Sequence, residues 1–171
     1  MEQTVSNDRL DIANGDVQTM GLRASTLSER FVELDIPARA DFLALARQVV
    51  VAVARTESSF GEDRLENLRL AVSEACTNAI RAHSMIGSQA SIHIRCELGE
   101  GRIVVEVADH GTGFDPDDVP VVPPATDPNR LLFESGLGIP LMQLFTDRTE
   151  ITSSPSGTNV RLVLLAMPLS T

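Results

Sequence analysis

The sequence contains no tryptophan, no tyrosine and only six phenylalanines among its 171 residues. It therefore has too few aromatic rings to build the stacking platforms that bind single-stranded nucleic acids. Its 24 acidic and 14 basic side chains give a formal net charge of −10, and such a charge opposes broad contact with the phosphate backbone of DNA or RNA. We therefore expect basic partners or protein surfaces, and no direct binding of nucleic acid.

Long apolar runs and cysteines are also scarce. No run approaches the roughly 18 apolar residues of a membrane-spanning helix, and the first 30 residues lack the order of segments that marks a signal peptide. We therefore expect a cytoplasmic protein with no membrane segment. Cys76 and Cys96 fall at apolar positions of an expected helix and an expected strand, which is typical of reduced, buried side chains. We expect neither a disulfide nor a metal cluster.

The composition indicates one soluble globular domain. A chain of 171 residues is long enough for one sizeable core, and its 43% apolar and 22% charged residues are close to the globular average. Residues 1–30 are polar and show no sustained helix or strand period. We therefore expect a mobile N-terminal extension over residues 1–30 and a single domain over residues 31–171.

Apolar residues at three- and four-residue spacing predict two long helices. The first runs from Arg39 to about Arg55, with an apolar stripe expected to comprise Phe42, Leu45, Ala46, Val49 and Val53. The second runs from Asp63 to about Ser84, with a stripe comprising Leu65, Leu68, Val72, Ala75, Cys76 and Ala79. We expect the second stripe to lie on a sheet.

Strict alternation of apolar and polar residues predicts strands over residues 31–36, 91–98 and 102–109. In the first of them, Val32, Leu34 and Ile36 should face inward. Near the C-terminal end, a short helix is expected over residues 137–145, with Pro140 in its first turn. Two further strands should follow over residues 149–154 and 158–166.

Residues 114–135 contain five prolines and no regular period. Loops of this length are often lids over ligands. The order of elements is thus strand, helix, helix, strand, strand, lid, helix, strand and strand. This order predicts an α/β two-layer sandwich, in which helices cover one face of a mixed, mostly antiparallel sheet.

Glu74 and Asn78 are four residues apart in the second helix, so they share a face that is turned away from the apolar stripe and toward a cavity. An asparagine oxygen is a hard, neutral ligand suited to Mg²⁺, and a glutamate one turn earlier could orient or deprotonate a nucleophile beside the same metal. Taken alone, the pair is a weak signal, and a solvated helix surface would be the favoured interpretation.

Three further motifs follow along the chain. Asp109 ends a strand and begins Asp-His-Gly-Thr-Gly, where its carboxylate could accept a hydrogen bond from an exocyclic amino group, while Gly111 and Gly113 allow close backbone approach. Gly136-Leu137-Gly138 precedes the short helix, whose free N–H groups could hold phosphate. Gly157-Thr158 opens the last strand. Each could also be an ordinary turn.

In this order, the four motifs together resemble the nucleotide-binding site of the GHKL ATPases, the superfamily of gyrase, Hsp90, MutL and histidine kinases. Within it, SEACTNAI, VADHGTGFDP, ESGLGIPLMQLFTDRTEI and SGTNVRL look most like the RsbW-type anti-sigma-factor serine kinases. The resemblance spans about residues 31–165 and implies a Bergerat-type ATP-binding fold. Many members have a histidine four residues after the asparagine, whereas this sequence has Ala82 there, followed by His83.

The resemblance implies a role for each motif residue. Asn78 would bind Mg²⁺, Glu74 would be the catalytic base, Asp109 would contact the adenine amino group of ATP, and Arg81 would contact phosphate. The remaining positions would shape the pocket, the lid and the adenine end: Gly111, Gly113, Gly136, Leu137, Gly138 and Thr158. Arg47, on the polar face of the first helix, would engage the sigma factor, with a solvated arginine as the alternative.

The function implied by the resemblance is that of an anti-sigma factor and Mg-ATP-dependent protein serine kinase. Such a protein sequesters a sigma factor, phosphorylates a serine on a STAS-type anti-anti-sigma protein and forms a homodimer. The alternative is an ATP-responsive switch that sequesters a partner without phosphorylating it, for which every motif residue except Glu74 would serve equally well. A histidine kinase catalytic domain is disfavoured, because no helical dimerisation segment with a phospho-accepting histidine precedes the motifs.

Overall fold

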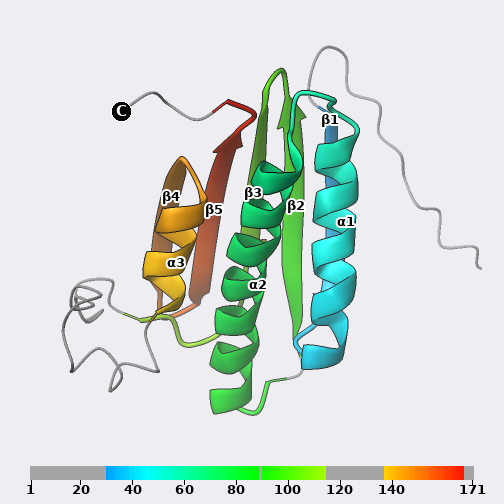
Figure 1. Cartoon of the computed structure of the whole chain (residues 1–171). Helices are drawn as coiled ribbons and strands as arrows, with labels where there is room; N and C mark the ends of the chain where they lie inside the picture. Colours follow the sequence, from blue (N-terminus) through cyan, green and yellow to red (C-terminus); the bar gives the residue numbers. More distant parts are fainter. Residues whose placement is uncertain (1–29, 89, 115–136, 168–171) are drawn as a thin grey trace, which may run out of the picture.

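The computed structural model describes residues 30–88, 90–114 and 137–167. Three α-helices cover one face of a five-stranded sheet, which makes a two-layer sandwich (Figure 1). The strands are β1 (Arg30–Pro37), β2 (Ser91–Gly99), β3 (Arg102–Ala108), β4 (Arg148–Ser154) and β5 (Gly157–Leu165). The helices are α1 (Leu43–Arg55), which follows a 3-10 turn over Ala40–Phe42, α2 (Glu62–Met85) and α3 (Gly138–Phe145). None of these described helices is both long and apolar enough to cross a membrane.

The strands lie in the order β1-β2-β3-β5-β4, and each neighbouring pair is antiparallel. The predicted order of elements and the α/β fold class are confirmed, and no parallel pair occurs among the described strands. After α3 the chain forms the β4–β5 hairpin, and β5 pairs with β3 along its length. The expected lid over residues 114–135 lies, apart from Phe114, outside the described residues.

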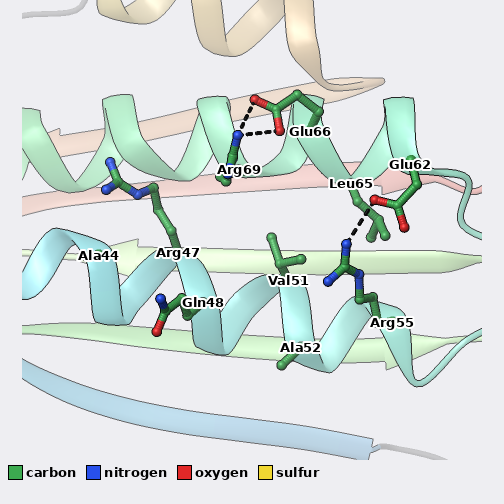
Figure 2. Close-up of a pocket in the computed structure, with 10 residues that line it drawn as sticks. All are labelled: Ala44, Arg47, Gln48, Val51, Ala52, Arg55, Glu62, Leu65, Glu66 and Arg69. Carbon is green, nitrogen blue, oxygen red and sulfur yellow. Dashed lines mark hydrogen bonds and ion pairs between the residues drawn. The ribbon is translucent and has the colours of Figure 1, made fainter.

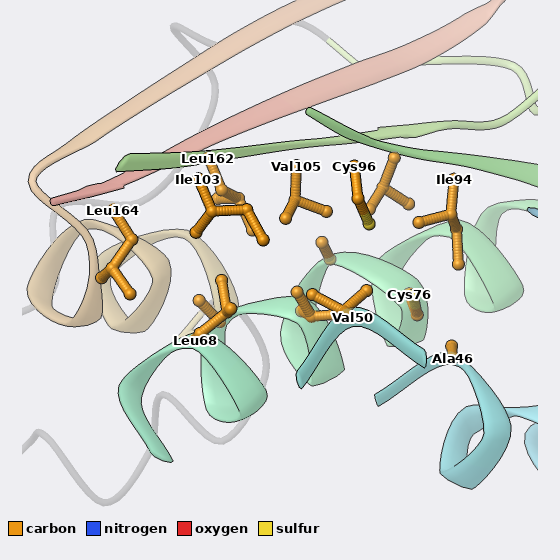
Figure 3. Packing of buried hydrophobic residues seen from close by; sticks show 14 of the residues in the cluster. Ala46, Val50, Leu68, Cys76, Ile94, Cys96, Ile103, Val105, Leu162 and Leu164 are labelled. Carbon is orange, nitrogen blue, oxygen red and sulfur yellow. The ribbon is translucent and has the colours of Figure 1, made fainter. Parts of the chain in front are cut away.

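The core lies between the sheet and the helices (Figure 3). Every second residue of β2 is buried, as the alternation predicts for a strand with one wet face. The predicted stripe of α2 is fully confirmed, because all six of its residues are buried. Cys76 of α2 and Cys96 of β2 belong to this core, and burial raises the pKa of each thiol to about 12. Both thiols are therefore protonated at neutral pH.

The predicted stripe of α1 is only partly correct. Ala46 is buried as expected, and Phe42 and Val53 pack against the core. Leu45, however, was expected to face inward and is 42% exposed, whereas Val50 and Ala54 outside the predicted stripe are buried. Nearly every residue between Leu43 and Ala54 is apolar, so periodicity alone cannot choose the buried face. That choice depends on the fit of α1 against the sheet and α2.

The expected inward row of β1 is only partly buried. Ile36 is buried and Leu34 is half-buried, but Val32 is 41% exposed although its cross-strand partner Cys96 is buried. β1 is an edge strand, so Val32 has a neighbouring strand on one side only. The pattern of the sequence indicates the face of a strand but not its position in the sheet.

An ion pair between Arg64 and Asp147 fixes the first turns of α2 to the far end of the sheet. The two side chains are 16% and 10% exposed. Arg64 Nε also donates to the carbonyl of Leu165 (2.9 Å), whose own N–H donates to the Asp147 carboxylate (2.8 Å). These bonds hold α2, which carries the candidate site residues Glu74, Asn78 and Arg81, against the ends of β4 and β5.

Candidate functional site

A pocket of about 610 Å³ lies where α2 and α3 meet the ends of β3, β4 and β5. Its volume is in the usual range for small-molecule sites. Much of its wall is apolar, formed by Val107, Ile139, Leu141, Met142, Ile151 and Val160. Eight of the residues singled out from the sequence also line it: Glu74, Asn78, Arg81, Asp109, Gly113, Leu137, Gly138 and Thr158. The tertiary structure thus brings all four motifs to one cavity.

Glu74 and Asn78 meet the first residue of α3 in this pocket. Both side chains are half-buried on α2. A Cβ atom placed on Gly138 would lie 3.0 Å from Asn78 Nδ2, 3.2 Å from Asn78 Oδ1 and 3.3 Å from Glu74 Oε2. Any larger residue would push against both polar side chains. The N-terminus of α3 therefore lies next to an amide and a carboxylate, and the first N–H groups of a helix have no acceptor within the helix.

Asp109 stands at the end of β3 and is buried, with 9% exposure. Its Oδ1 accepts a hydrogen bond from the N–H of Gly111 (2.8 Å), and its own N–H donates to the carbonyl of Thr158 (2.9 Å). Its other carboxylate oxygen accepts no hydrogen bond from the described residues. The carboxylate is thus held at one oxygen while the other can receive a donor from a ligand.

The hairpin β4–β5 supports the turn after Asp109. Gly113 has φ +65°, and a Cβ there would lie 2.0 Å from the carbonyl oxygen of Ser154. The hydroxyl of Ser153 accepts a hydrogen bond from the N–H of Phe114 (2.8 Å) and lies 3.1 Å from the hydroxyl of Thr158. Sequence reasoning missed Ser153. The available signal was its position opposite Thr158 across a predicted hairpin.

Of the residues predicted for the nucleotide pocket and described by the structure, Gly111 alone does not line it. Gly111 is buried behind Asp109, and a Cβ on it would lie 2.7 Å from the Cβ of Ala82. It is therefore a packing position beneath the turn. Gly136 lies outside the described residues. Arg81 is an exposed residue of the pocket wall that forms no ion pair with any described carboxylate.

A family model described as histidine kinase-like ATPase domain matches residues 36–164. The chain belongs to this family. The matched range includes every predicted site residue, and it contains all four motifs that line the pocket. As a histidine kinase-like ATPase, the protein belongs to a class that uses ATP.

Within this family, the chain is similar to proteins named serine-protein kinase RsbW. The serine-protein kinase RsbW of Bacillus velezensis is 33% identical in an alignment of 137 positions that covers 77% of this chain and 83% of that protein. The serine-protein kinase RsbW of Bacillus cereus is 35% identical in an alignment of 136 positions that covers 73% of this chain and 80% of that protein. The resemblance to RsbW-type kinases is confirmed.

Two solved structures share the fold of this histidine kinase-like ATPase. One contains the RsbU and RsbW domains of a Mycobacterium tuberculosis protein, with a TM-score of 0.57 at 14% identity, over 80% of this chain and 32% of that chain. The other is the SiaB–SiaC complex from Pseudomonas aeruginosa, with a TM-score of 0.55 at 13% identity, over 78% of this chain and 88% of that chain. They confirm the predicted fold.

The donors in the pocket of this ATPase domain fit Mg²⁺ held together with a nucleotide. Among the described residues, no group of three or more His, Cys, Asp or Glu side chains is placed to hold a metal ion. Mg²⁺ often takes only one or two protein ligands, with the other positions filled by water and substrate phosphates. The Asn78 amide oxygen beside the N-terminus of α3 is a suitable single ligand.

Arg47 lies outside the pocket, in a groove of about 350 Å³ between α1 and α2 (Figure 2). The other two arginines of the groove are ion-paired with glutamates of α2: Arg55 with Glu62 at 2.8 Å and Arg69 with Glu66 at 2.6 Å. Arg47 is half-buried and reaches only the hydroxyl of Ser73, at 3.5 Å. Its charge is thus not neutralised by any described carboxylate.

Proposed function

We propose that this protein is a Mg-ATP-dependent protein serine kinase that sequesters a sigma factor and phosphorylates a serine on a STAS-type anti-anti-sigma protein. The observation that carries the chemistry is the contact of Glu74 and Asn78 with the N-terminus of α3 at Gly138. The relatives named serine-protein kinase RsbW support the reaction. The partner classes rest on the resemblance to RsbW-type anti-sigma kinases.

The pocket suggests how ATP is held. The free carboxylate oxygen of Asp109 would accept a hydrogen bond from the adenine amino group, and Thr158 lines the same pocket. The apolar wall would enclose the base. At the other end, the N-terminus of α3 would offer N–H groups to the phosphates, and the unpaired charge of Arg81 would offset part of their negative charge.

Phosphoryl transfer depends mostly on positioning and charge neutralisation. Asn78 would ligate Mg²⁺, which when bound neutralises charge on the phosphates. Glu74 would accept the proton of the serine hydroxyl while the serine oxygen bonds to the γ-phosphorus. The bond between that phosphorus and the β,γ-bridging oxygen breaks, and ADP leaves with the electron pair. Glu74 then holds the proton, and the partner carries phosphoserine.

Arg47 is proposed to contact the partner. Its guanidinium reaches no carboxylate within the described part of the chain, so an acidic group of a bound protein would find an available cation in the groove. We further propose that the protein forms a homodimer and acts in the cytoplasm, where sigma factors work. Light scattering after size-exclusion chromatography would measure the mass of the particle directly.

Glu74→Ala separates the kinase from an ATP-responsive switch. Loss of a base acting in the transition state should reduce phosphoryl transfer by roughly 10²–10⁴-fold with little change in ATP affinity. Asn78→Ala should weaken Mg-ATP binding itself, because it removes a metal ligand. Glu100→Ala, in the exposed β2–β3 turn, is the matched control and should change neither.

The assay mixes the purified variants with labelled ATP and candidate STAS proteins, and calorimetry measures ATP binding separately. Transfer at the parental rate by Glu74→Ala would show that Glu74 is not the base. If the parental protein phosphorylates no STAS partner while ATP still controls its binding to a sigma factor, the protein is a switch and the kinase proposal fails.

A further inference from the structure

His83 is a fully buried polar residue near the C-terminal end of α2. Its Nε2 accepts a hydrogen bond from the backbone N–H of His110 (3.3 Å), and its Nδ1 has no hydrogen-bond partner among the described residues. A neutral imidazole accepts at Nε2 only when Nδ1 carries the proton. His83 thus makes its one hydrogen bond at the expense of a buried, unpaired N–H. Such a group costs free energy and requires an explanation.

The hydrogen bond that His83 accepts holds the peptide group between Asp109 and His110 in place. On one side of that residue, the N–H of Asp109 is held by the carbonyl of Thr158. On the other side, the N–H of His110 is held by His83. The two bonds together fix the backbone before and after Asp109, a residue that lines the pocket.

The end of α2 is also shaped to receive this turn. A Cβ on Gly111 would lie 2.7 Å from the Cβ of Ala82, the residue before His83. The turn therefore rests on consecutive residues of α2, through contact at Ala82 and through a hydrogen bond at His83. His83 does not line the pocket itself, so any effect on a ligand must pass through Asp109 or the turn that follows it.

We propose that His83 is a positioning residue that aims the Asp109 carboxylate at the nucleotide base and so sets the preference for adenine over guanine. The inference rests on the proposed function, in which Asp109 receives the adenine amino group. Adenine presents a donor at that position, whereas guanine presents an oxygen acceptor that a fixed carboxylate repels. A carboxylate free to turn away would discriminate less between the two bases.

Three substitutions of His83 separate positioning from packing. His83→Gln can place an amide oxygen close to the position of Nε2 and should keep ATP affinity and the ATP/GTP preference within about threefold of the parent. His83→Leu has a similar volume but no acceptor. His83→Asn is polar but too short to reach the same position. The His83→Leu and His83→Asn variants should each lower ATP affinity and the ATP/GTP preference by at least about tenfold. His93→Leu, on the opposite face of the sheet, is the control.

The Tm measured by thermal denaturation distinguishes a positioning role of His83 from a role in packing alone. His83→Leu removes a buried, unpaired N–H, but it also takes the acceptor from the part-buried N–H of His110. The two changes oppose each other, so the Tm should stay close to that of the parent even though ATP binding weakens. A merely structural role predicts a lower Tm with an unchanged ATP/GTP preference.

Calorimetric titration of each variant with ATP and with GTP decides the question. If His83→Leu does not fold, the comparison of the Gln and Asn variants replaces it. Parental affinity and preference in both the Leu and Asn variants, or in Asn alone when Leu is unfolded, overturn the inference. Asp109→Asn is titrated in parallel. If it weakens ATP binding while the His83 variants do not, only this inference fails. If it leaves ATP binding unchanged, the site assignment and this inference both fail.

Discussion

Stability in alkaline solution should depend on the two buried thiols. Burial raises the pKa of Cys76 and of Cys96 from the ordinary value of 9.0 to about 12. All 14 basic residues of the sequence are arginine, and the sequence has no tyrosine. No other side chain therefore has its ordinary pKa between pH 9 and pH 12. The free energy of ionising a buried thiol can therefore be measured in this protein without interference from lysine or tyrosine titration.

The direction follows from proton linkage. Between pH 9 and pH 12, the unfolded chain has lost both thiol protons while the folded protein keeps them. The stability that the protonated thiols provide is therefore fully present below pH 9 and is lost as the pH rises toward 12. With two groups, the free energy of unfolding should fall by about 2.7 kcal/mol per pH unit, or about 5 kcal/mol from pH 9 to pH 11. That is comparable to the whole stability of many domains.

Urea unfolding under reducing conditions at pH 8, 9, 10 and 11 tests this prediction. Far-ultraviolet circular dichroism suits the measurement because the chain has no tryptophan. The variant carrying both Cys76→Ala and Cys96→Ala is the control. It will be less stable at every pH because it leaves cavities, but the fall between pH 9 and pH 11 should be lost. An equal fall in the variant, or a flat profile in the parent, would refute the reasoning.

Two further predictions concern the boundaries of the domain and the adenine end of the pocket. Asp109→Asn should lower ATP affinity by at least about tenfold, because one acceptor oxygen becomes an NH₂ donor that faces the adenine amino group; an unchanged dissociation constant by calorimetry would show that the base binds elsewhere. Deletion of residues 1–29, which ends just before β1, should leave the Tm and ATP affinity nearly unchanged. Unfolding or loss of ATP binding in the truncated protein would mean that these residues are structural.

The sequence predicts the elements well wherever one face of an element is polar. The six-residue stripe of α2 and the alternation of β2 indicate their buried faces correctly, because a single amphipathic period leaves one arrangement that removes apolar side chains from water. The same reasoning is only partly correct for α1, whose residues are apolar on nearly all sides. It fails differently for Val32, whose exposure depends on its place at the edge of the sheet.

Some features of the candidate site could be predicted from the sequence, and others could not. Glu74 and Asn78 could be assigned to one helix face because a spacing of four residues is a local property. The order of the motifs sufficed for the resemblance to RsbW-type kinases, which the similarity to known proteins confirms. The motifs by themselves do not show the residues that support them, because Ser153 beneath Phe114 and His83 beneath the turn after Asp109 are contacts between distant segments.

The sequence by itself therefore determined the elements, the fold class and the family, since these depend on periodicity and on short motifs that lie within one segment. Only the tertiary structure decided which face of α1 is buried, that Gly111 is a packing position, and that His83 holds the peptide after Asp109. These features depend on how close two separate segments come. Distances of a few ångströms between segments are set by the packing of the whole core, and no local pattern of residues encodes them.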